Sequence, residues 1–327
     1  MTKNKKIWYK ILLTVCVLSL LIGTGLFFFL KEEKTVRIIF ISKCIDEKND
    51  FWNALMAGAN MAAKEYNAEL TITAAKTEID YEEQNRLIEE AIKQKPDVIM
   101  LAPADYVKTL PVAKKIKEHH IRLVLVDCGL EENIEDIRVS TNNYEAGYKV
   151  GEYMATFMEK DTKAAIISHV KGNSSAMERE KGIKAALGEN ASQIVDTVYS
   201  DSDFEKAYEV TKELLQENPD ITVLAGTNEY SAVGAAQAVK ELGLSDRIRF
   251  VGFDNSVTEA QLLEEGVFEG IVVQKPFNIG YLGVEKAVEL CKGRELGSFI
   301  DSGSELITRE TMYTPENEKL LFPFWGK

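Results

Sequence analysis

Short apolar runs alternate with longer amphipathic segments after residue 35, and this pattern predicts strands and helices in turn. The apolar runs are rich in Val, Ile and Leu, and the segments between them repeat their apolar positions at helical spacing. The first predicted strands are residues 36–41, 69–74, 97–101 and 123–126, and the helices between them are 51–66, 81–94 and 109–119. Near-continuous apolar strands separated by such helices are typical of a parallel sheet covered on both faces.

The same alternation starts again after Thr141-Asn142-Asn143. The predicted strands are now 164–169, 194–199, 223–226, 248–253, 270–274 and 305–308, and the helices are 144–158, 176–187, 204–216, 230–242, 257–265 and 279–291. The chain therefore holds two α/β units of similar size. Because open parallel sheets bind ligands beyond the carboxyl ends of their strands, we expect the ligand in a cleft between the two units.

Residues 11–30 form an uncharged apolar run of a different kind. Twenty residues of helix span about 30 Å, the thickness of the hydrocarbon core of a bilayer. Four lysines precede the run, whereas the charges of residues 31–34 cancel, so the positive-inside rule places the N-terminus in the cytoplasm. The run predicts a transmembrane anchor with the rest of the chain outside the cell membrane.

Two other processing routes fit the same segment. Gly23-Thr24-Gly25 could be the cleavage site of a signal peptide, and Cys16 could be a lipoprotein cysteine. The apolar run continues through residues 26–30, which a mature N-terminus has no reason to keep, and Val15 stands where a small residue would precede a lipidated cysteine. An uncleaved anchor is therefore favoured, and all three routes export the domain, so cleavage would leave it periplasmic or secreted.

The composition of the chain argues against several classes of function. A chain of 327 residues that is 45% hydrophobic is not disordered, and its formal net charge of −13 argues against binding nucleic acid. Residues 1–34 carry +4, so the remaining 33 basic and 50 acidic residues give the exported part −17. With three His and four Cys, and no nucleophile elbow or phosphate loop, we expect no metal site, no cofactor and no enzymatic activity.

Polar and aromatic residues gather at the predicted strand ends and predict one ligand site. They are Asn49, Phe51, Trp52 and Asp127 in the first unit and Arg179, Phe204, Asn228, Asp254 and Gln274 in the second. Carboxylates, amides and Arg pair with hydroxyl groups, and aromatic rings cover the C–H face of a sugar. Any one of these residues could instead be a core residue or a helix cap, but together they suit a neutral polyol.

Eight sequence blocks carry a family resemblance. In chain order they are FWNALMAGA, APAD, VLVDCG, SSAMEREKGI, SDFEKAYEV, AGTNEYSAVGAAQAV, VGFDNS and GIVVQKPFNIG. Over residues 36–313 the chain resembles the periplasmic sugar-binding proteins of the ribose and galactose type, whose type I periplasmic binding protein fold also occurs in the effector domains of the lactose-repressor family. The resemblance implies two doubly wound parallel-sheet lobes joined by a three-crossing hinge. The lobes would be 35–141 plus 275–303 and 142–274 plus 304–327, with 1–34 as the membrane segment.

The resemblance also implies a role for each first-lobe candidate. Asn49 looks like the ligand-binding amide of the first loop, Phe51 and Trp52 like the stacking pair, and Asp127 like the acceptor at a strand end. Two positions depart from the ribose type, because Cys128 replaces an Arg and Ala102 an Asn in this part of the pocket. The lost donors put ribose itself in doubt.

The second-lobe candidates are similar to the opposite wall of the family's cleft. Arg179 matches the arginine that bridges to sugar oxygens, Phe204 resembles the aromatic lid, and the polar wall would be Asn228, Asp254 and Gln274. Hinge bending about the crossings is the expected response to ligand.

The implied function is that of an extracytoplasmic, membrane-tethered solute-binding protein. It would capture a monosaccharide or similar polyol between its lobes and present it to an ABC transporter. A sensor that signals sugar occupancy to a membrane histidine kinase is the alternative. A repressor of the same fold would need a helix-turn-helix where residues 1–34 are hydrophobic. The third alternative is an enzyme, or an orphan structural module that has lost its ligand.

Overall fold

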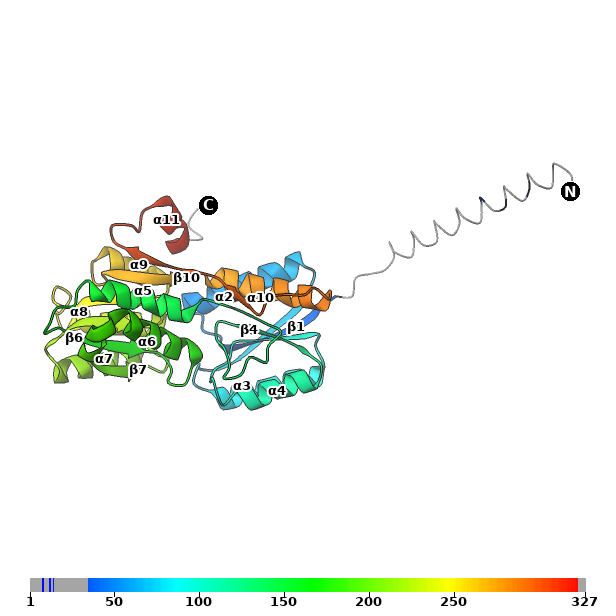
Figure 1. Ribbon diagram of the computed structural model, residues 1–327, viewed down its shortest axis with the longest axis horizontal. Helices are drawn as coiled ribbons and strands as arrows, with labels where there is room; N and C mark the ends of the chain where they lie inside the picture. The colour runs from blue at the N-terminus through cyan, green and yellow to red at the C-terminus, as the bar shows by residue number, and fades with distance from the viewer. Residues whose placement is uncertain (1–7, 9–11, 13, 15–34, 323–327) are drawn as a thin grey trace. The chain divides into compact units, whose positions relative to one another are not determined.

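The computed structural model describes residues 8, 12, 14 and 35–322 (Figure 1). The chain divides into two units, Met1–Thr35 and Val36–Lys327. The apolar run at 11–30 falls, apart from Leu12 and Thr14, outside the described residues. Within the residues that are described, no helix has both the length and the apolar character needed to cross a bilayer.

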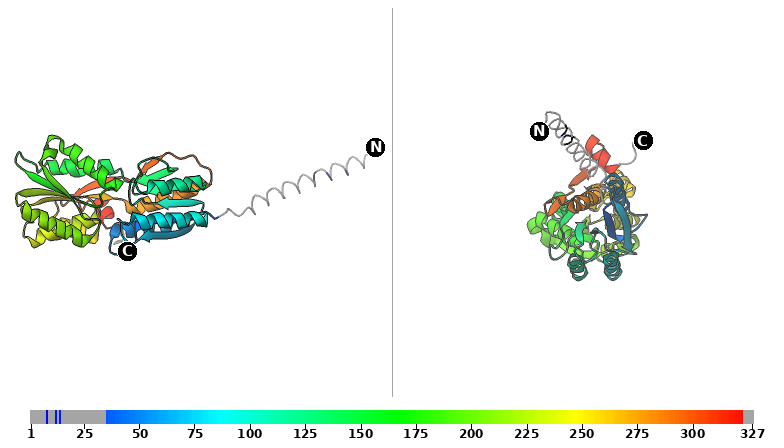
Figure 2. Two further views of the ribbon diagram at one scale, coloured as in Figure 1. Left: turned by 90° about the horizontal axis from the view of Figure 1, so that it is seen from below. Right: turned by 90° about the vertical axis from the view of Figure 1, so that its right-hand side faces the viewer.

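Two six-stranded sheets organise residues 36–322 (Figure 2). The first sheet has the order β11-β5-β4-β3-β1-β2 and is parallel throughout. Its strands are β1 (Arg37–Cys44), β2 (Glu69–Ala75), β3 (Val98–Leu101), β4 (Arg122–Val126), β5 (Ile137–Ser140) and β11 (Phe299–Asp301). The helices of this lobe are α2 (Asp50–Glu65), α3 (Tyr81–Gln94), α4 (Leu110–Glu118) and α10 (Pro276–Cys291).

The second sheet has the order β12-β10-β9-β8-β6-β7, and only its edge strand β12 runs antiparallel among the pairs described. Its strands are β6 (Lys163–Ser168), β7 (Ile194–Tyr199), β8 (Ile221–Gly226), β9 (Arg249–Phe253), β10 (Gly270–Gln274) and β12 (Ser304–Thr308). Its helices are α5 (Asn143–Ala155), α6 (Ser174–Leu187), the 3-10 turn η1 (Gly188–Gln193), α7 (Phe204–Glu217), α8 (Glu229–Glu241), α9 (Val257–Glu264) and α11 (Pro315–Leu321). The predicted α/β class with two mainly parallel sheets is confirmed.

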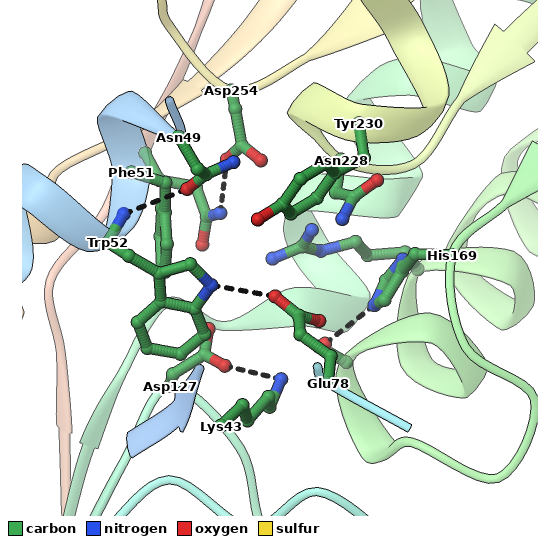
Figure 3. A pocket seen from close by; sticks show the side chains of 13 residues that line it. Lys43, Asn49, Phe51, Trp52, Glu78, Asp127, His169, Asn228, Tyr230 and Asp254 are labelled. Carbon is green, nitrogen blue, oxygen red and sulfur yellow. Dashed lines mark hydrogen bonds and ion pairs between the residues drawn. The ribbon is translucent and has the colours of Figure 1, made fainter. Parts of the chain in front are cut away.

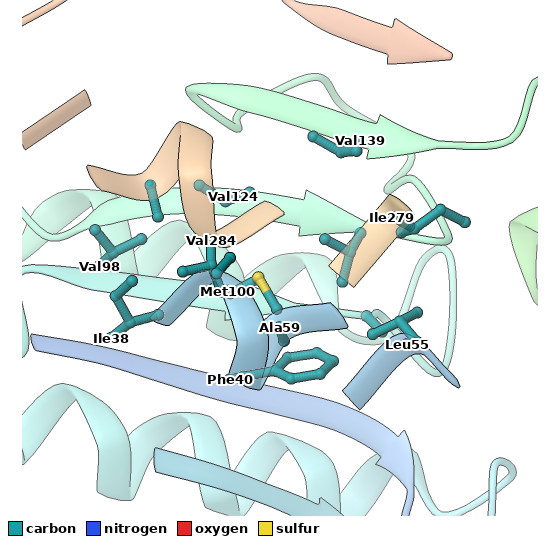
Figure 4. Packing of buried hydrophobic residues seen from close by; sticks show 14 of the residues in the cluster. Ile38, Phe40, Leu55, Ala59, Val98, Met100, Val124, Val139, Ile279 and Val284 are labelled. Carbon is teal, nitrogen blue, oxygen red and sulfur yellow. The ribbon is translucent and has the colours of Figure 1, made fainter. Parts of the chain in front are cut away.

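Each sheet is buried on both faces, which explains the nearly continuous apolar strands. In β1, Ile38 and Phe40 point into the core under α2 and α10 (Figure 4). Ile39 and Ile41 belong to the core under α3 and α4 on the other face. This is the period of two expected of a strand. The second sheet repeats the arrangement, with α5 and α6 packed together on one face and α7 and α8 on the other.

The chain passes between the sheets in three places. It leaves the first sheet after β5 and enters α5, which packs on α6 and β9. It returns after β10 through α10, which packs on α2 and β4, and it crosses once more between β11 and β12. The first and third passages are joined by hydrogen bonds, since the Asn142 N–H donates to Asp301 at 2.9 Å and the Thr141 and Ser302 hydroxyl oxygens lie 3.2 Å apart.

Three elements lay outside the sequence prediction. The strands β5 and β11 are only four and three residues long, and each carries a polar residue within the run. Short runs of this kind give little periodic signal. The third is α11, a seven-residue helix that starts with Pro315 at its first position and is capped by Thr314.

Candidate functional site

A pocket lies between the two lobes at the carboxyl ends of their strands (Figure 3). It is lined by Lys43, Asn49, Phe51, Trp52, Glu78, Asp127, His169, Ser175, Arg179, Asn228, Tyr230, Asp254 and Gln274.

The structure brings eight of the nine candidate residues together around this pocket. The exception is Phe204, whose ring packs on Tyr230 with 4.6 Å between ring centroids. Tyr230, and not Phe204, presents an aromatic face to the pocket from the second lobe. Phe204 thus supports the wall from behind.

The loop after β1 shapes the aromatic wall of the first lobe. The side chain of Asn49 accepts a hydrogen bond from the Trp52 backbone N–H at 2.9 Å and so caps α2. This cap places Phe51 and Trp52 at the start of the helix, with their rings edge to face at 5.1 Å. The indole N–H of Trp52 donates to Glu78 at 2.7 Å, which fixes the plane of the ring.

A buried ion pair forms the floor of the first lobe. Lys43, near the end of β1, lies 2.7 Å from Asp127, and the two side chains are 2% and 4% exposed. Burial would lower the pKa of Lys43, but the neighbouring Asp127 carboxylate outweighs it and the pKa is raised. Burial would likewise raise the pKa of Asp127, but Lys43 and Arg179 hold it below its usual range. Both groups are therefore ionised at neutral pH.

Arg179 extends from α6 into the pocket with its fork held rigidly. Its Nε donates to Asn143 at 2.9 Å and its Nη1 to the Thr227 carbonyl at 2.6 Å. The guanidinium also lies over the ring of Phe253, 3.9 Å from the ring centroid. The remaining N–H groups face the pocket in a preorganised donor array, which suits an acceptor-rich ligand.

Three polar residues from β8, β9 and β10 complete the second lobe. Asn228 caps α8 through a bond from the Ser231 N–H at 3.0 Å. Asp254 accepts from Gln274 Nε2 at 2.5 Å, and burial raises the pKa of its carboxyl group. Gln274 Oε1 is buried without a protein partner among the described residues, so it is an acceptor that a ligand hydroxyl could use.

His169 lines the pocket as a neutral ring. Its two nitrogens lie 2.8 Å from Thr227 Oγ1 and 2.9 Å from Ser175 Oγ. Burial, together with the cations Arg179 and Lys43, lowers the pKa of His169 well below its ordinary value. The ring orients two hydroxyl groups at the pocket wall. No group of three or more potential ligand side chains within the described residues could hold a metal ion.

The sequence analysis did not include Lys43, Glu78, His169, Ser175 and Tyr230 among the candidate site residues, although all five line the pocket. It ended the first strand at Ile41, although β1 continues to Cys44, so Lys43 was assigned to a polar loop. A reading that allowed one charged residue at the strand end would have found Lys43. Glu78 lies in the loop that follows β2, and Ser175 lies in the first turn of α6, which follows β6. The strand-end rule covers both places, but the residue types gave no special signal.

Comparison with known proteins identifies the family of this chain. The family described as "Periplasmic binding protein domain" matches residues 39–295. A D-ribose/D-allose-binding protein of Pseudomonas aeruginosa is 27% identical, with 83% of this chain and 88% of the relative covered.

Two crystal structures share the fold. A sugar transporter from Clostridium phytofermentans is 47% identical, with a TM-score of 0.80 and coverage of 84% of this chain and 99% of the other. An ABC transporter solute binding protein from Agrobacterium vitis with bound D-fucose is 28% identical, with a TM-score of 0.84 and coverage of 87% and 99%. The relatives are binding and transport proteins, in agreement with the prediction that the chain is not an enzyme. The resemblance seen in the sequence is confirmed, and the chain belongs to the periplasmic binding protein domain family.

Proposed function

We propose that this protein is an extracytoplasmic solute-binding protein that captures a monosaccharide or similar polyol and presents it to an ABC transporter. The pocket carries the proposal, because Phe51, Trp52 and Tyr230 supply aromatic faces while charged and amide groups from both lobes converge on the same small space. Rings and bidentate polar groups together match the C–H faces and hydroxyl groups of a sugar. The relative named as a D-ribose/D-allose-binding protein and the solute binding protein with bound D-fucose support the same class of ligand.

The particular sugar depends on the floor of the pocket. Cys128 Sγ donates to Asp127 at 3.0 Å and lies 3.3 Å from Asn173, so it is occupied by the protein. Ala102 is fully buried and offers no polar group. Lys43 supplies the donor that these two positions lack, which argues for a sugar whose hydroxyl pattern differs from that of ribose.

We assign the nine sequence-predicted residues to this site, with Phe204 acting through Tyr230. The lobes would be residues 35–141 plus 275–303 and 142–274 plus 304–327, and they would close over the ligand by bending at the three crossings. Polar side chains of both lobes meet directly across the cleft, as in the bond from Tyr230 Oη to Asp46 at 2.8 Å. Such contacts would form only when the lobes are closed.

The membrane tether is the second part of the proposal. The uncharged run at 11–30 and the lysines before it support an uncleaved anchor that holds the binding domain outside the cell membrane. Membrane fractionation with mass measurement of the N-terminus tests it. An intact N-terminus in the membrane fraction is expected, and a shortened, released chain would support signal cleavage.

The same run favours a sensor as the alternative function. An anchored domain stays beside its membrane partner, and this suits a histidine kinase that reads sugar occupancy. Deleting an adjacent permease or kinase gene separates the two. Loss of sugar uptake would support transport, whereas loss of a sugar-induced transcriptional response with normal uptake would support sensing.

Calorimetric titration with a panel of pentoses, hexoses and related polyols tests the binding function. At least one sugar should bind, and Arg179→Ala and Asp254→Ala should each weaken it by about tenfold or more, because each removes a charged partner of the ligand. Lys184→Ala, on the exposed side of the same helix as Arg179, is the matched control. If no member of the panel binds, or if the two pocket variants bind like the control, the sugar-binding proposal is wrong.

A further inference from the structure

Glu78 is a buried carboxylate whose two oxygens serve opposite lobes. It lies in the loop between β2 and α3 and is 5% exposed. Its Oε1 accepts from Trp52 Nε1 at 2.7 Å within the first lobe, and its Oε2 accepts from Ser202 Oγ at 2.8 Å in the second lobe. One side chain therefore joins an aromatic wall of the pocket to the opposite side of the cleft. Figure 3 shows the Trp52 half of this connection.

The connection continues to a second pocket residue. Ser202 Oγ also accepts from Asn228 Nδ2 at 3.3 Å. Trp52, Glu78, Ser202 and Asn228 thus form one hydrogen-bonded series, which we call the cross-lobe series. Both of its ends face the ligand pocket, and its middle link is the contact between the lobes.

The turn that carries Ser202 has a strained backbone. Asp201 and Ser202 have φ values of 53° and 54°, in the left-handed region that side chains other than Gly rarely adopt. Asp203 then caps α7, and Lys206 forms an ion pair with Asp201, which together hold the turn. Two successive strained residues persist only where the surroundings fix them, and they are common at functional sites. Here they aim the Ser202 hydroxyl at Glu78.

The hydrogen bonds that Glu78 accepts from Trp52 and Ser202 come from neutral donors. No cationic side chain among residues 35–322 forms an ion pair with it, and the nearby Lys43 is engaged by Asp127. Hydrogen bonds to an ionised group are roughly twice as strong as neutral ones. Opening the lobes would remove the Ser202 donor and leave only Trp52, so the closed arrangement is the one that satisfies Glu78.

We infer that Glu78 is a positioning residue that couples lobe closure to the orientation of the Trp52 ring. This inference rests on the proposed function, since the ring acts on the ligand that the pocket takes. Glu78 holds the indole plane against the ligand from one side and stabilises the closed lobes through Ser202 on the other. A bound ligand therefore dissociates slowly because both walls are held by the same carboxylate.

Two substitutions at position 78 test the coupling. Glu78→Ala removes both acceptor oxygens. It should lower the affinity for the tightest-binding sugar of the panel by about tenfold or more, mainly through faster dissociation. Glu78→Gln can still accept from the indole N–H and can donate to Ser202 Oγ, so it should restore most of the affinity. Ser202→Ala removes only the contact between the lobes and should speed dissociation while leaving the Trp52 environment of the ligand-free protein unchanged. Glu82→Ala, an exposed glutamate in α3, is the control.

Stopped-flow binding and Trp52 fluorescence, in a background where Trp8 and Trp325 are replaced by Phe, give the readouts. In the ligand-free protein, Glu78→Ala should shift the Trp52 emission to longer wavelength, because the indole loses its hydrogen-bond partner. Small-angle scattering of the ligand-free protein should show a smaller population of closed molecules in both Glu78→Ala and Ser202→Ala. These ligand-free readouts remain valid if no sugar binds, so they separate failure of this inference from failure of the sugar-binding proposal. The inference is overturned if Glu78→Gln is as impaired as Glu78→Ala, or if Ser202→Ala matches the wild type in dissociation and closure.

Discussion

The ammonium group of Lys43 lies 2.7 Å from the carboxylate of Asp127, and this pair joins the end of β1 to the end of β4 beneath the ligand pocket. Neither residue could be exchanged alone without leaving a charge inside the lobe. Because Asp127 also accepts from Cys128 Sγ, the pair fills the region where the ribose-type pocket has other donors. The floor of the pocket is thus a fixed part of the first lobe.

Lys43→Met should destabilise the protein by about 3 to 5 kcal/mol, because it leaves the Asp127 carboxylate buried without its cation. Urea unfolding followed by circular dichroism measures the loss. The double variant Lys43→Met with Asp127→Asn should recover much of the stability, since the buried charge is then absent. Lys114→Met breaks a surface pair with Glu132 and is the control, with an expected effect below about 1 kcal/mol. Equal losses in Lys43→Met and the control would contradict the prediction.

The rule that sites gather at strand ends predicted most of the pocket, because strand ends are set by local periodicity. Asp127 and Asp254 follow an apolar run directly, Gln274 ends one, and Asn228 follows one after a single threonine. The structure brings all four to the pocket. Phe204 lies beyond the polar loop that follows β7, at the start of α7, and its ring packs on Tyr230. Which way a side chain points depends on packing from another helix, and sequence periodicity carries no such information.

Contacts between the lobes could not be predicted from the sequence either, because they also depend on packing between distant segments. Glu78 and Ser202 are 124 positions apart, and nothing local distinguishes them from other loop residues. Lys43 was missed because a charged residue inside a buried strand contradicts the usual pattern of apolar strands. Such exceptions are tolerated where a distant partner compensates the charge, so they are recognised only in three dimensions.

Stability should fall as the pH rises from about 4.5 to about 8, through Glu229. Glu229 is the first residue of α8. Its carboxyl group accepts hydrogen bonds from the backbone N–H groups of Asp50 and Phe51 in the other lobe, each at 3.3 Å. Burial, reinforced by Asp254, raises the pKa of Glu229 to about 8, whereas a Glu in the unfolded chain titrates near about 4.3. The folded protein therefore binds the proton more tightly in this window, and each pH unit within it costs up to about 1.4 kcal/mol of the free energy of unfolding.

Urea unfolding between pH 5 and 9 measures this dependence. Glu229→Gln keeps the shape of the side chain and cannot titrate, so its profile should be flatter than that of the wild type between about pH 4.5 and 8 and parallel to it above that range. The prediction is wrong if the two profiles run parallel throughout. Glu241→Gln, at the exposed end of the same helix, should leave the wild-type slope unchanged.

Gly280→Ala should destabilise the first lobe by about 1 to 3 kcal/mol, or somewhat more. A Cβ atom at this position of α10 would lie 1.9 Å from the Leu55 carbonyl oxygen of α2, and backbone atoms cannot turn aside as a side chain can. Separating the helices would also move Phe51 and Trp52 at the start of α2, so sugar affinity should fall. Gly297→Ala meets nothing within 4 Å and is the matched control. A melting temperature for Gly280→Ala equal to that of the control would show that the helices can separate without cost.

Cys128 should resist alkylation although it lies next to the pocket. Its thiol is buried, and burial together with the Asp127 charge raises the pKa of Cys128 to about 11, so little thiolate is present at pH 8. Cys291, whose side chain is exposed near the end of α10, should react first with iodoacetamide, as peptide mass mapping of timed samples would show. In urea the two should react at similar rates, because both then behave as ordinary thiols. Rapid modification of Cys128 in the folded protein would mean that the pocket floor opens to solvent and that this thiol is accessible to oxidants.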